Sequence, residues 1–334
     1  MILVTGATGI LGRVIVLELL RKGKTVYAAK RSSSDIEDVK KSYIYYTRDA
    51  EMFFDKIHWI DLELNDFRRI EKKLIGIEEI YHCAAKVSYD PKDEHEISKI
   101  NIEGTKNILK AAVQANIKKF LYVSSAAIFA TKKDQIISEN SEYNNFKKAT
   151  FYAAAKYKAE LQVLKAVKAG LKTIMINPGM IIGSGNWNDS SGQLLTQLIN
   201  SKYTYSGGTG CVDVRDVAKI AIALMEKNKF GELFILVSEN KKYVELHQFI
   251  NKNINKLDPF ILSKNILLIG RFSKIFLGRL FPELRMLTKP NIEFLASFPK
   301  LSNKKLMNEL QYHFIPIEES IHFHIGNYLH ETIR

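Results

Sequence analysis

The chain has 334 residues, 46% of them hydrophobic and 10% aromatic, which provides for a large packed core and excludes an intrinsically disordered chain. The net charge is +13, but no nucleic-acid-binding motif accompanies it, so we expect no nucleic-acid partner. Two cysteines are too few for a disulfide framework, and neither a secretory leader nor a run of about 18 apolar residues occurs, so we expect a cytoplasmic protein without a membrane-spanning helix.

Short apolar runs alternate with helical patterns along the first 178 residues. The runs expected to form strands are Ile2–Val4, Thr25–Ala29, Ile57–Ile60, Glu79–His82, Phe120–Ser124 and Thr173–Ile176. The segments with helical periodicity are Ile10–Arg21, Phe67–Leu74, Ile97–Ala115 and Phe151–Ala169. The strands do not alternate apolar with polar residues, which is typical of parallel strands buried on both faces.

The pattern changes after Pro178. Residues 179–192 are rich in Gly, Ser and Asn and are expected to form a loop. Residues 212–227 are predicted to return to helix and residues 232–238 to strand, whereas the chain from about 239 onwards is expected to be helical, basic and irregular. Together the segments predict an α/β fold: a doubly wound parallel sheet with a smaller, mostly helical C-terminal part.

The turn between the first strand and the first helix carries Gly6, Gly9 and Gly12 in the spacing G-x-x-G-x-x-G. Without Cβ atoms there, backbone N–H groups can approach a pyrophosphate, and the N-terminus of the following helix faces its negative charge. Gly12 also allows the helix to pack closely on the strand. This context predicts a dinucleotide-binding turn.

Further segments, in their order along the chain, resemble the extended short-chain dehydrogenase/reductase superfamily. They are YHCAAKVS (81–88), NIEGTKNILKAA (101–112), LYVSSAAIFA (121–130), FYAAAKYKAE (151–160), INPGMIIGSGN (176–186) and VDVRDVA (212–218). The resemblance covers about residues 1–240, and NPGMIIGSGNW with VDVRDVA is most similar to the dihydroflavonol reductase-like group. It implies an NAD(P)-dependent enzyme. The expected Rossmann domain comprises 1–178 and about 212–238, and the substrate-binding part about 179–211 and 239–334.

The end of the second predicted strand indicates the choice of nicotinamide cofactor. An NAD-preferring fold usually places an acid there, to hold the ribose 2′-hydroxyl. This chain has Lys30, Arg31 and Ser32 instead, and no acid before Asp35. Cations and hydroxyls suit a 2′-phosphate, so NADP is expected, with NAD as the alternative. The resemblance implies that the cofactor is held by Thr5, Gly6, Thr8, Gly9, Ile10, Leu11, Gly12, Lys30, Arg31, Ser32, Asp61, Leu62, Ala84, Ala85, Lys86, Tyr152, Lys156 and Pro178.

Tyr152 and Lys156 lie four residues apart on a predicted helix and therefore share a face. A nearby ammonium group lowers the pKa of a phenol from its ordinary value near 10, so Tyr152 could exchange a proton with a carbonyl or an alcohol. Ser124 and Ser125 are both candidates for an oxyanion-binding hydroxyl, and the family spacing to Phe129 selects Ser125. Asn101 matches a family asparagine of a proton relay, although support of the local backbone explains it equally well.

Three functions remain open on this scaffold. The first is hydride transfer between the nicotinamide and a carbonyl or alcohol of a bulky, largely apolar small molecule, with Phe272, Phe276, Phe281, Phe294 and Phe298 either lining the pocket or simply part of the core. The second is a nucleotide-sugar epimerase, and the third is a non-catalytic dinucleotide-sensing module. No metal site is predicted, because His322 and His324 have no partner ligands at suitable spacing.

The stretch 263–284 combines apolar residues with Arg271, Lys274 and Arg279. A basic amphipathic helix of this kind can lie on an anionic membrane surface or cover the substrate pocket, and we expect the latter. A homodimer is a further expectation, because many relatives pair through the helices around the tyrosine.

Overall fold

A seven-stranded parallel sheet forms the centre of the molecule, in the order β11-β7-β5-β4-β1-β2-β3. The computed structural model describes residues 1–131, 135–187, 190–277 and 282–332. The sheet strands are β1 (Ile2–Thr5), β2 (Val26–Lys30), β3 (His58–Asp61), β4 (Glu79–His82), β5 (Lys119–Val123), β7 (Thr173–Pro178) and β11 (Leu233–Leu236). The predicted doubly wound parallel sheet is confirmed, and its strands start and end within two residues of the predicted bounds.

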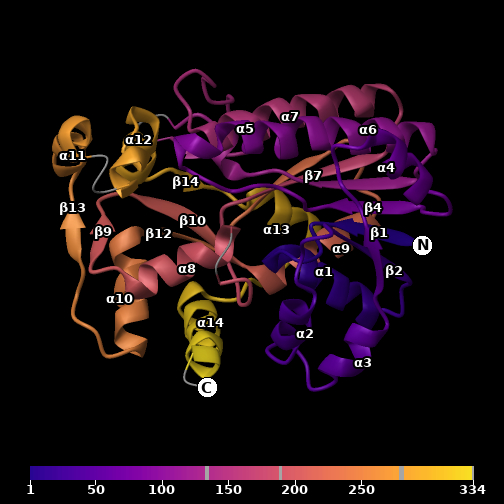
Figure 1. Ribbon diagram of the computed structural model, residues 1–334, viewed down its shortest axis with the longest axis horizontal. Coiled ribbons are helices and arrows are strands. Elements are labelled where there is room, and N and C mark those ends of the chain that lie inside the picture. The colour runs from indigo at the N-terminus through magenta and orange to yellow at the C-terminus, as the bar shows by residue number, and fades with distance from the viewer. Residues whose placement is uncertain (132–134, 188–189, 278–281, 333–334) are drawn as a thin grey trace.

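Helices cover both faces of this sheet (Figure 1). One face carries α1 (Ile10–Arg21), α2 (Glu37–Tyr43), α3 (Ala50–Asp55) and α9 (Val214–Glu226). The other carries α4 (Phe67–Lys73), α5 (Glu94–Ile97), α6 (Thr105–Gln114) and α7 (Phe151–Lys168). Each face buries its own hydrophobic cluster, which explains why the strands are apolar on both sides.

The remaining elements form the left-hand part of Figure 1. A three-stranded sheet contains β8 (Met180–Ile182), β10 (Gly208–Asp213) and β12 (Glu239–Lys242). Two strand pairs join β9 (Tyr203–Tyr205) to β13 (Phe260–Leu262) and β6 (Ile136–Ile137) to β14 (Lys300–Leu301). The helices are α8 (Ser190–Asn200), α10 (Tyr243–Asn253), α11 (Lys264–Leu277), α12 (Lys289–Ala296), α13 (Lys304–Leu310) and α14 (Ile317–Thr332).

Several predicted elements differ from the structure. The predicted loop 179–192 contains β8 and the start of α8, the predicted helix 212–227 begins only after β10 ends, and the chain after 239 contains short strands as well as helices. The predicted helix 97–115 is a π-helical stretch, Ser98–Gly104, followed by α6. The short strands escaped prediction because their partners are distant in sequence: Cys211 of β10 pairs with Met180 and with Glu239.

The sheet order places the functional region. β1 lies between β2 and β4, so the chain direction across the sheet reverses beside β1. In open α/β sheets a crevice forms at this reversal, outside the carboxyl ends of the strands. The glycine turn follows β1 at this edge, and the segment with Ala84 and Ala85 follows β4 there.

Candidate active site

The glycine turn has the shape that an anionic ligand requires. Gly6 has a φ of +66°, and a Cβ atom there would lie 2.7 Å from the backbone nitrogen of Ala84. A Cβ on Gly12 would lie 2.1 Å from the carbonyl oxygen of Gly6. The N-cap of α1, Gly9, brings no capping side chain, and the first turn of the helix contains no acid. The first N–H groups of α1 therefore remain available for a ligand, and the turn fits a dinucleotide pyrophosphate.

A cavity of about 1060 Å³ runs from this turn into the C-terminal part of the molecule. Most of the predicted site residues line it: Thr5, Gly6, Thr8, Gly9, Ile10, Leu11, Gly12, Lys30, Arg31, Leu62, Ala84, Ala85, Lys86, Ser125, Tyr152, Lys156 and Pro178. Three predicted site residues, Ser32, Asp61 and Asn101, are absent from the cavity wall. Contrary to the expectation from sequence, the fold does not bring these three side chains to the cavity.

Tyr152 and Lys156 lie in the first turns of α7. Thr150 caps this helix by accepting a hydrogen bond from the N–H of Ala153 at 3.2 Å, and threonine is a favoured N-cap residue. The helix therefore begins at Phe151 and presents both side chains to the cavity. The ammonium group of Lys156 donates a hydrogen bond to the carbonyl oxygen of Val123 at 2.6 Å, which ties α7 to the end of β5.

Burial changes the proton affinity of both groups. It lowers the pKa of Lys156 to about 8, against the opposing influence of Cys83 and Glu160. It raises the pKa of Tyr152 to about 12, and the hydrogen bond with Ser125 offsets this only partly. The sequence analysis expected Lys156 to lower the pKa of Tyr152. In the protein without ligands the shift has the opposite direction, because the phenol is only 9% exposed and desolvation outweighs the nearby charge.

Ser125, rather than Ser124, is the partner of the tyrosine. It follows β5 and begins a short 3₁₀ turn, where its hydroxyl accepts a hydrogen bond from the N–H of Ala127 at 3.2 Å. Its carbonyl oxygen accepts from the amide of Asn177, which also donates to Glu160 at 3.2 Å. Glu160 and Asn177 thus hold the serine segment in place. Sequence analysis missed both, although Glu160 lies one helical turn after Lys156.

Asn101 has a supporting role in this structure. It is 1% exposed within the π-helical stretch, and its amide bonds the backbone of Lys86 twice: it accepts from the N–H at 2.8 Å and donates to the carbonyl at 3.0 Å. These bonds fix the segment after β4 that carries Ala84 and Ala85. Of the two explanations given by the sequence, backbone support is the one that the geometry matches. π-Helical segments occur frequently at functional sites.

The adenosine end of the cavity contains a cation beside an ion pair. Lys30 contacts the carboxylate of Asp61 at 2.6 Å, which lowers the pKa of that acid and occupies both charges. Arg31 is exposed, lines the cavity and forms no ion pair within the described residues. Ser34, which the sequence analysis did not single out, lines the cavity in place of Ser32.

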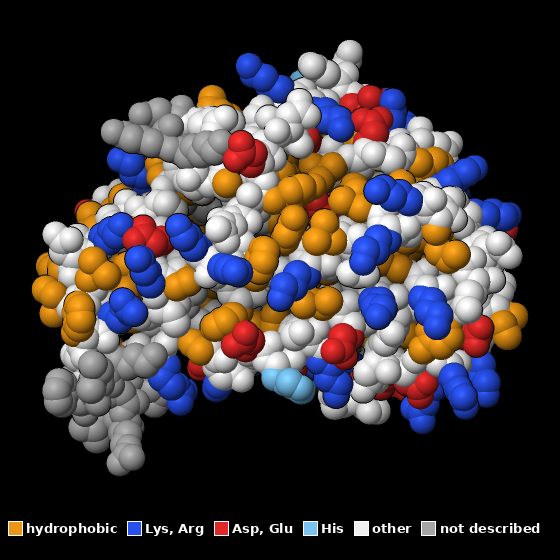
Figure 2. Space-filling model, turned by 90° about the horizontal axis from the view of Figure 1, so that it is seen from above, with side chains coloured by type: hydrophobic (Ala, Val, Ile, Leu, Met, Phe, Trp, Pro, Cys, Tyr) orange, Lys and Arg blue, Asp and Glu red, His pale blue; other side chains and the backbone are white. Residues whose placement is uncertain are grey.

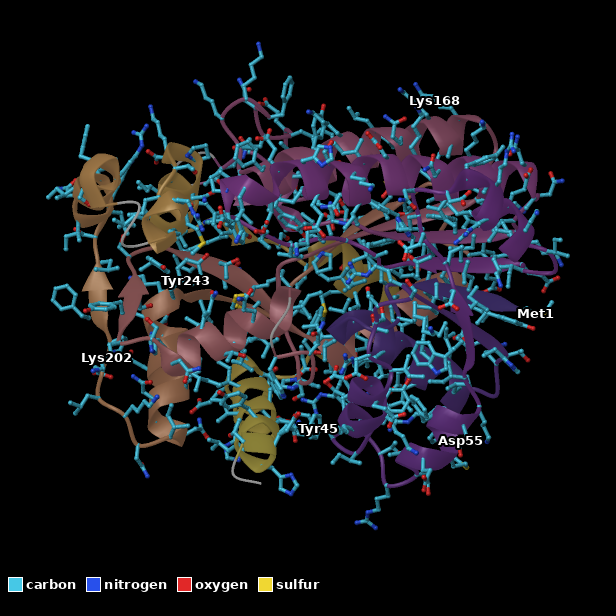
Figure 3. All side chains as sticks on the ribbon, in the orientation of Figure 1. Met1, Tyr45, Asp55, Lys168, Lys202 and Tyr243 are labelled. Carbon is cyan, nitrogen blue, oxygen red and sulfur yellow. The ribbon has the colours of Figure 1, made fainter. Side chains whose placement is uncertain are left out.

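The far end of the cavity is apolar. Tyr89 lies beside Tyr152, with ring centroids 6.1 Å apart, and stacks on Phe294 of α12 at 5.3 Å. Phe272, in contrast, is 68% exposed and is not part of the pocket, and Phe298 does not line it. The predictions for Phe276 and Phe281, and those for Lys274 and Arg279, concern side chains outside the described residues. Figure 3 marks Tyr243, another lining residue, at the start of α10.

A parallel sheet with a glycine turn at its switch point, and Ser125, Tyr152 and Lys156 in one cavity, defines a nicotinamide-dinucleotide enzyme of the short-chain dehydrogenase/reductase class. Comparison with known proteins agrees with this class. Residues 2–236 match the model of the NAD dependent epimerase/dehydratase family, and the chain belongs to that family. It is an NAD(P)-dependent enzyme of the extended type.

Individual relatives are more distant. A Synechocystis protein provisionally named dihydroflavonol 4-reductase is 29% identical over 245 residues, 71% of this chain and 67% of its own. The crystal structure of gox2253 has a TM-score of 0.83 at 24% identity, over 99% of this chain and 98% of that one. The Thermus thermophilus UDP-glucose 4-epimerase in complex with NAD has a TM-score of 0.75 at 17% identity and covers 98% of both chains. At these identities the two structures show a shared fold.

Proposed function

We propose that this enzyme is an NADP-dependent reductase acting on the carbonyl group of a bulky, largely apolar small molecule. One observation carries the proposal: beyond Pro178, no described residue that lines the cavity is charged. The charged residues of the wall, Lys30, Arg31, Glu63, Lys86, Glu96, Lys99 and Lys156, all belong to the first half of the chain. The half of the cavity facing a substrate is built from Leu, Met, Phe, Tyr and a few neutral polar side chains.

This wall disfavours the epimerase alternative. A nucleotide sugar carries a diphosphate, and proteins hold phosphate groups with Arg or Lys side chains or with helix N-termini. An uncharged apolar wall instead gains from burying apolar surface of the substrate, at about 25 cal/mol per Å². The name of the Synechocystis relative also supports a reductase.

Preference for NADP rests on the adenosine end of the cavity. Asp61, the nearest candidate for a ribose 2′-hydroxyl, is already paired with Lys30. Arg31 can meet a 2′-phosphate with two parallel hydrogen bonds. The same end of the cavity offers the hydroxyl of Ser34.

The residues of α7 and β5 supply the proton. A bound nicotinamide supplies or accepts the hydride. Tyr152, kept protonated at neutral pH by burial, is in the form that donates a proton to a carbonyl oxygen. Ser125 hydrogen-bonds the same oxygen as negative charge develops on it. Lys156 ties the tyrosine helix to β5 and is a donor toward the ribose hydroxyls.

The test is NADPH consumption, followed at 340 nm, with a panel of aromatic aldehydes and fused-ring ketones, and separately with UDP-glucose. We expect turnover with an apolar carbonyl compound. Tyr152→Phe should lower kcat by about 100-fold or more, because general acid catalysis contributes at least that much, while NADPH affinity stays nearly unchanged. The matched control is Tyr157→Phe on the same helix, a residue outside the cavity wall. Conversion of UDP-glucose to its 4-epimer without net NADPH consumption would overturn the proposal.

A further inference from the structure

Exposed apolar side chains gather on one face of the C-terminal part, formed by β9, β13 and the start of α11. We call this the β13–α11 face. Its members are Tyr203 (55% exposed), Leu257 (91%), Phe260 (60%), Ile261 (46%), Ile266 (41%), Ile269 (70%) and Phe272 (68%). Phe260 pairs with Tyr203 across the two strands, with ring centroids 6.3 Å apart. A contiguous apolar surface of this kind marks an interaction site.

Helix α11 is apolar on two opposite sides. Leu267 is 4% exposed and lines the cavity, and Gly270 lies against Leu287, another lining residue. Ile269 and Phe272, three residues apart and therefore on one side, point to solvent. The expectation that this segment covers the substrate pocket fits the inner side. It leaves the outer side without a partner within the described part of the chain.

The surroundings of this face are basic. Lys202, Lys252, Lys256, Lys264 and Arg271 are all exposed, whereas Asp258 is the one acid between residues 252 and 273. Two of the lysines pair with acids of other helices: Lys264 with Glu293 at 2.8 Å and Lys252 with Glu318 at 3.8 Å. The stretch 252–305 carries 11 Lys and Arg against 3 Asp and Glu.

The figures agree with this distribution. Figure 1 places β13 and α11 at the left-hand margin of the molecule, away from the seven-stranded sheet. In Figure 2 hydrophobic and basic side chains lie side by side at that end. Lys202 lies at the same margin in Figure 3. The apolar and basic groups therefore share one end of the protein.

We propose that the β13–α11 face docks on a membrane surface containing anionic lipid. The apolar side chains would enter the boundary between headgroups and acyl chains, and the surrounding lysines and Arg271 would meet the lipid phosphates. Among the described residues no helix is long and apolar enough to cross a bilayer, so the contact is peripheral. Because α11 separates this face from the cavity, docking places the apolar wall next to the bilayer. That last point rests on the proposed function, but docking itself does not.

Vesicle co-sedimentation tests the proposal. The full-length protein is incubated at about 50 mM salt with phosphatidylcholine vesicles, or with vesicles containing about 30% phosphatidylserine, and the bound fraction is measured. The test variant is Ile269→Ser/Phe272→Ser. The matched control is Ile44→Ser/Ile75→Ser, which removes two exposed side chains (54% and 82%) beside α2 and α4. Thermal melting and NADPH binding verify that each variant is folded.

We expect wild type and control to bind the anionic vesicles about tenfold more than the neutral ones, and less as salt increases. The test variant should lose about tenfold in binding while it melts as the wild type does. Failure of the wild type to sediment with anionic vesicles would overturn the proposal, as would unchanged binding of the test variant. A wild-type dimer that becomes monomeric in the test variant, without vesicle binding, would overturn it too and assign the face to a second copy of the chain. Epimerase activity would leave the docking result intact, so the two proposals fail separately.

Discussion

Replacing Gly12 by alanine is the most direct test of the dinucleotide turn. The added Cβ would lie 2.1 Å from the carbonyl oxygen of Gly6, whereas ordinary contact begins at 3.4 Å, so α1 must move away from the turn by more than about 1 Å. The clash is with backbone atoms, and no side chain can rotate to relieve it. Overpacking costs about 1–3 kcal/mol, and we expect the upper end of this range. NADPH affinity should fall at the same time, because the first N–H groups of α1 move with the helix.

The same substitution at Gly326 provides the control. Gly326 lies in the exposed part of α14, and a Cβ there would meet nothing within 4 Å. Glycine in a helix interior costs about 1 kcal/mol relative to alanine, so Gly326→Ala should stabilise the protein by up to that amount. Denaturation in urea and titration of NADPH by fluorescence measure both effects. A Gly12→Ala protein with wild-type stability and wild-type NADPH affinity would refute the close packing on which the turn depends.

Three further predictions concern charge. Arg31→Gln should weaken NADPH binding by about 10-fold to 100-fold, the equivalent of a lost charge-assisted contact, and leave NADH binding unchanged; equal losses for both cofactors in a titration would argue against a 2′-phosphate contact. Lys156→Met should abolish activity yet stabilise the ligand-free protein at pH 7 by about 1–2 kcal/mol, because a buried ammonium with a pKa near 8 folds at a cost that persists below pH 8 and disappears as the pH rises toward 10.5; urea denaturation at pH 7 and pH 10 measures the difference. Burial lowers the pKa values of His82 and His324 below 6.5, so the unfolded chain binds more protons and stability should decline as the pH falls through that value, visible as a lower Tm at pH 5.5 than at pH 7.5.

Local sequence determined the dinucleotide half of the molecule. Gly6 and Gly12 stand where backbone approaches backbone, and Thr150 starts the tyrosine helix at the right residue. The strands were recognisable because a sheet covered on both faces requires continuous apolar runs, a demand that each segment meets by itself. Most cavity residues of this half were therefore predictable from their order along the chain.

Tertiary structure alone decided the substrate half and the state of the catalytic groups. β8, β10 and β12 exist only as a set, because the hydrogen bonds of each strand come from segments far away in sequence. The pKa of Tyr152 rises instead of falling, because desolvation depends on every neighbour that excludes water. Asn101 supports the backbone of Lys86, and Asp61 is taken by Lys30, for the same reason: each partner is brought near by the fold. A sequence pattern specifies the contacts of a residue with its neighbours along the chain, whereas burial and long-range pairing are properties of the assembled molecule.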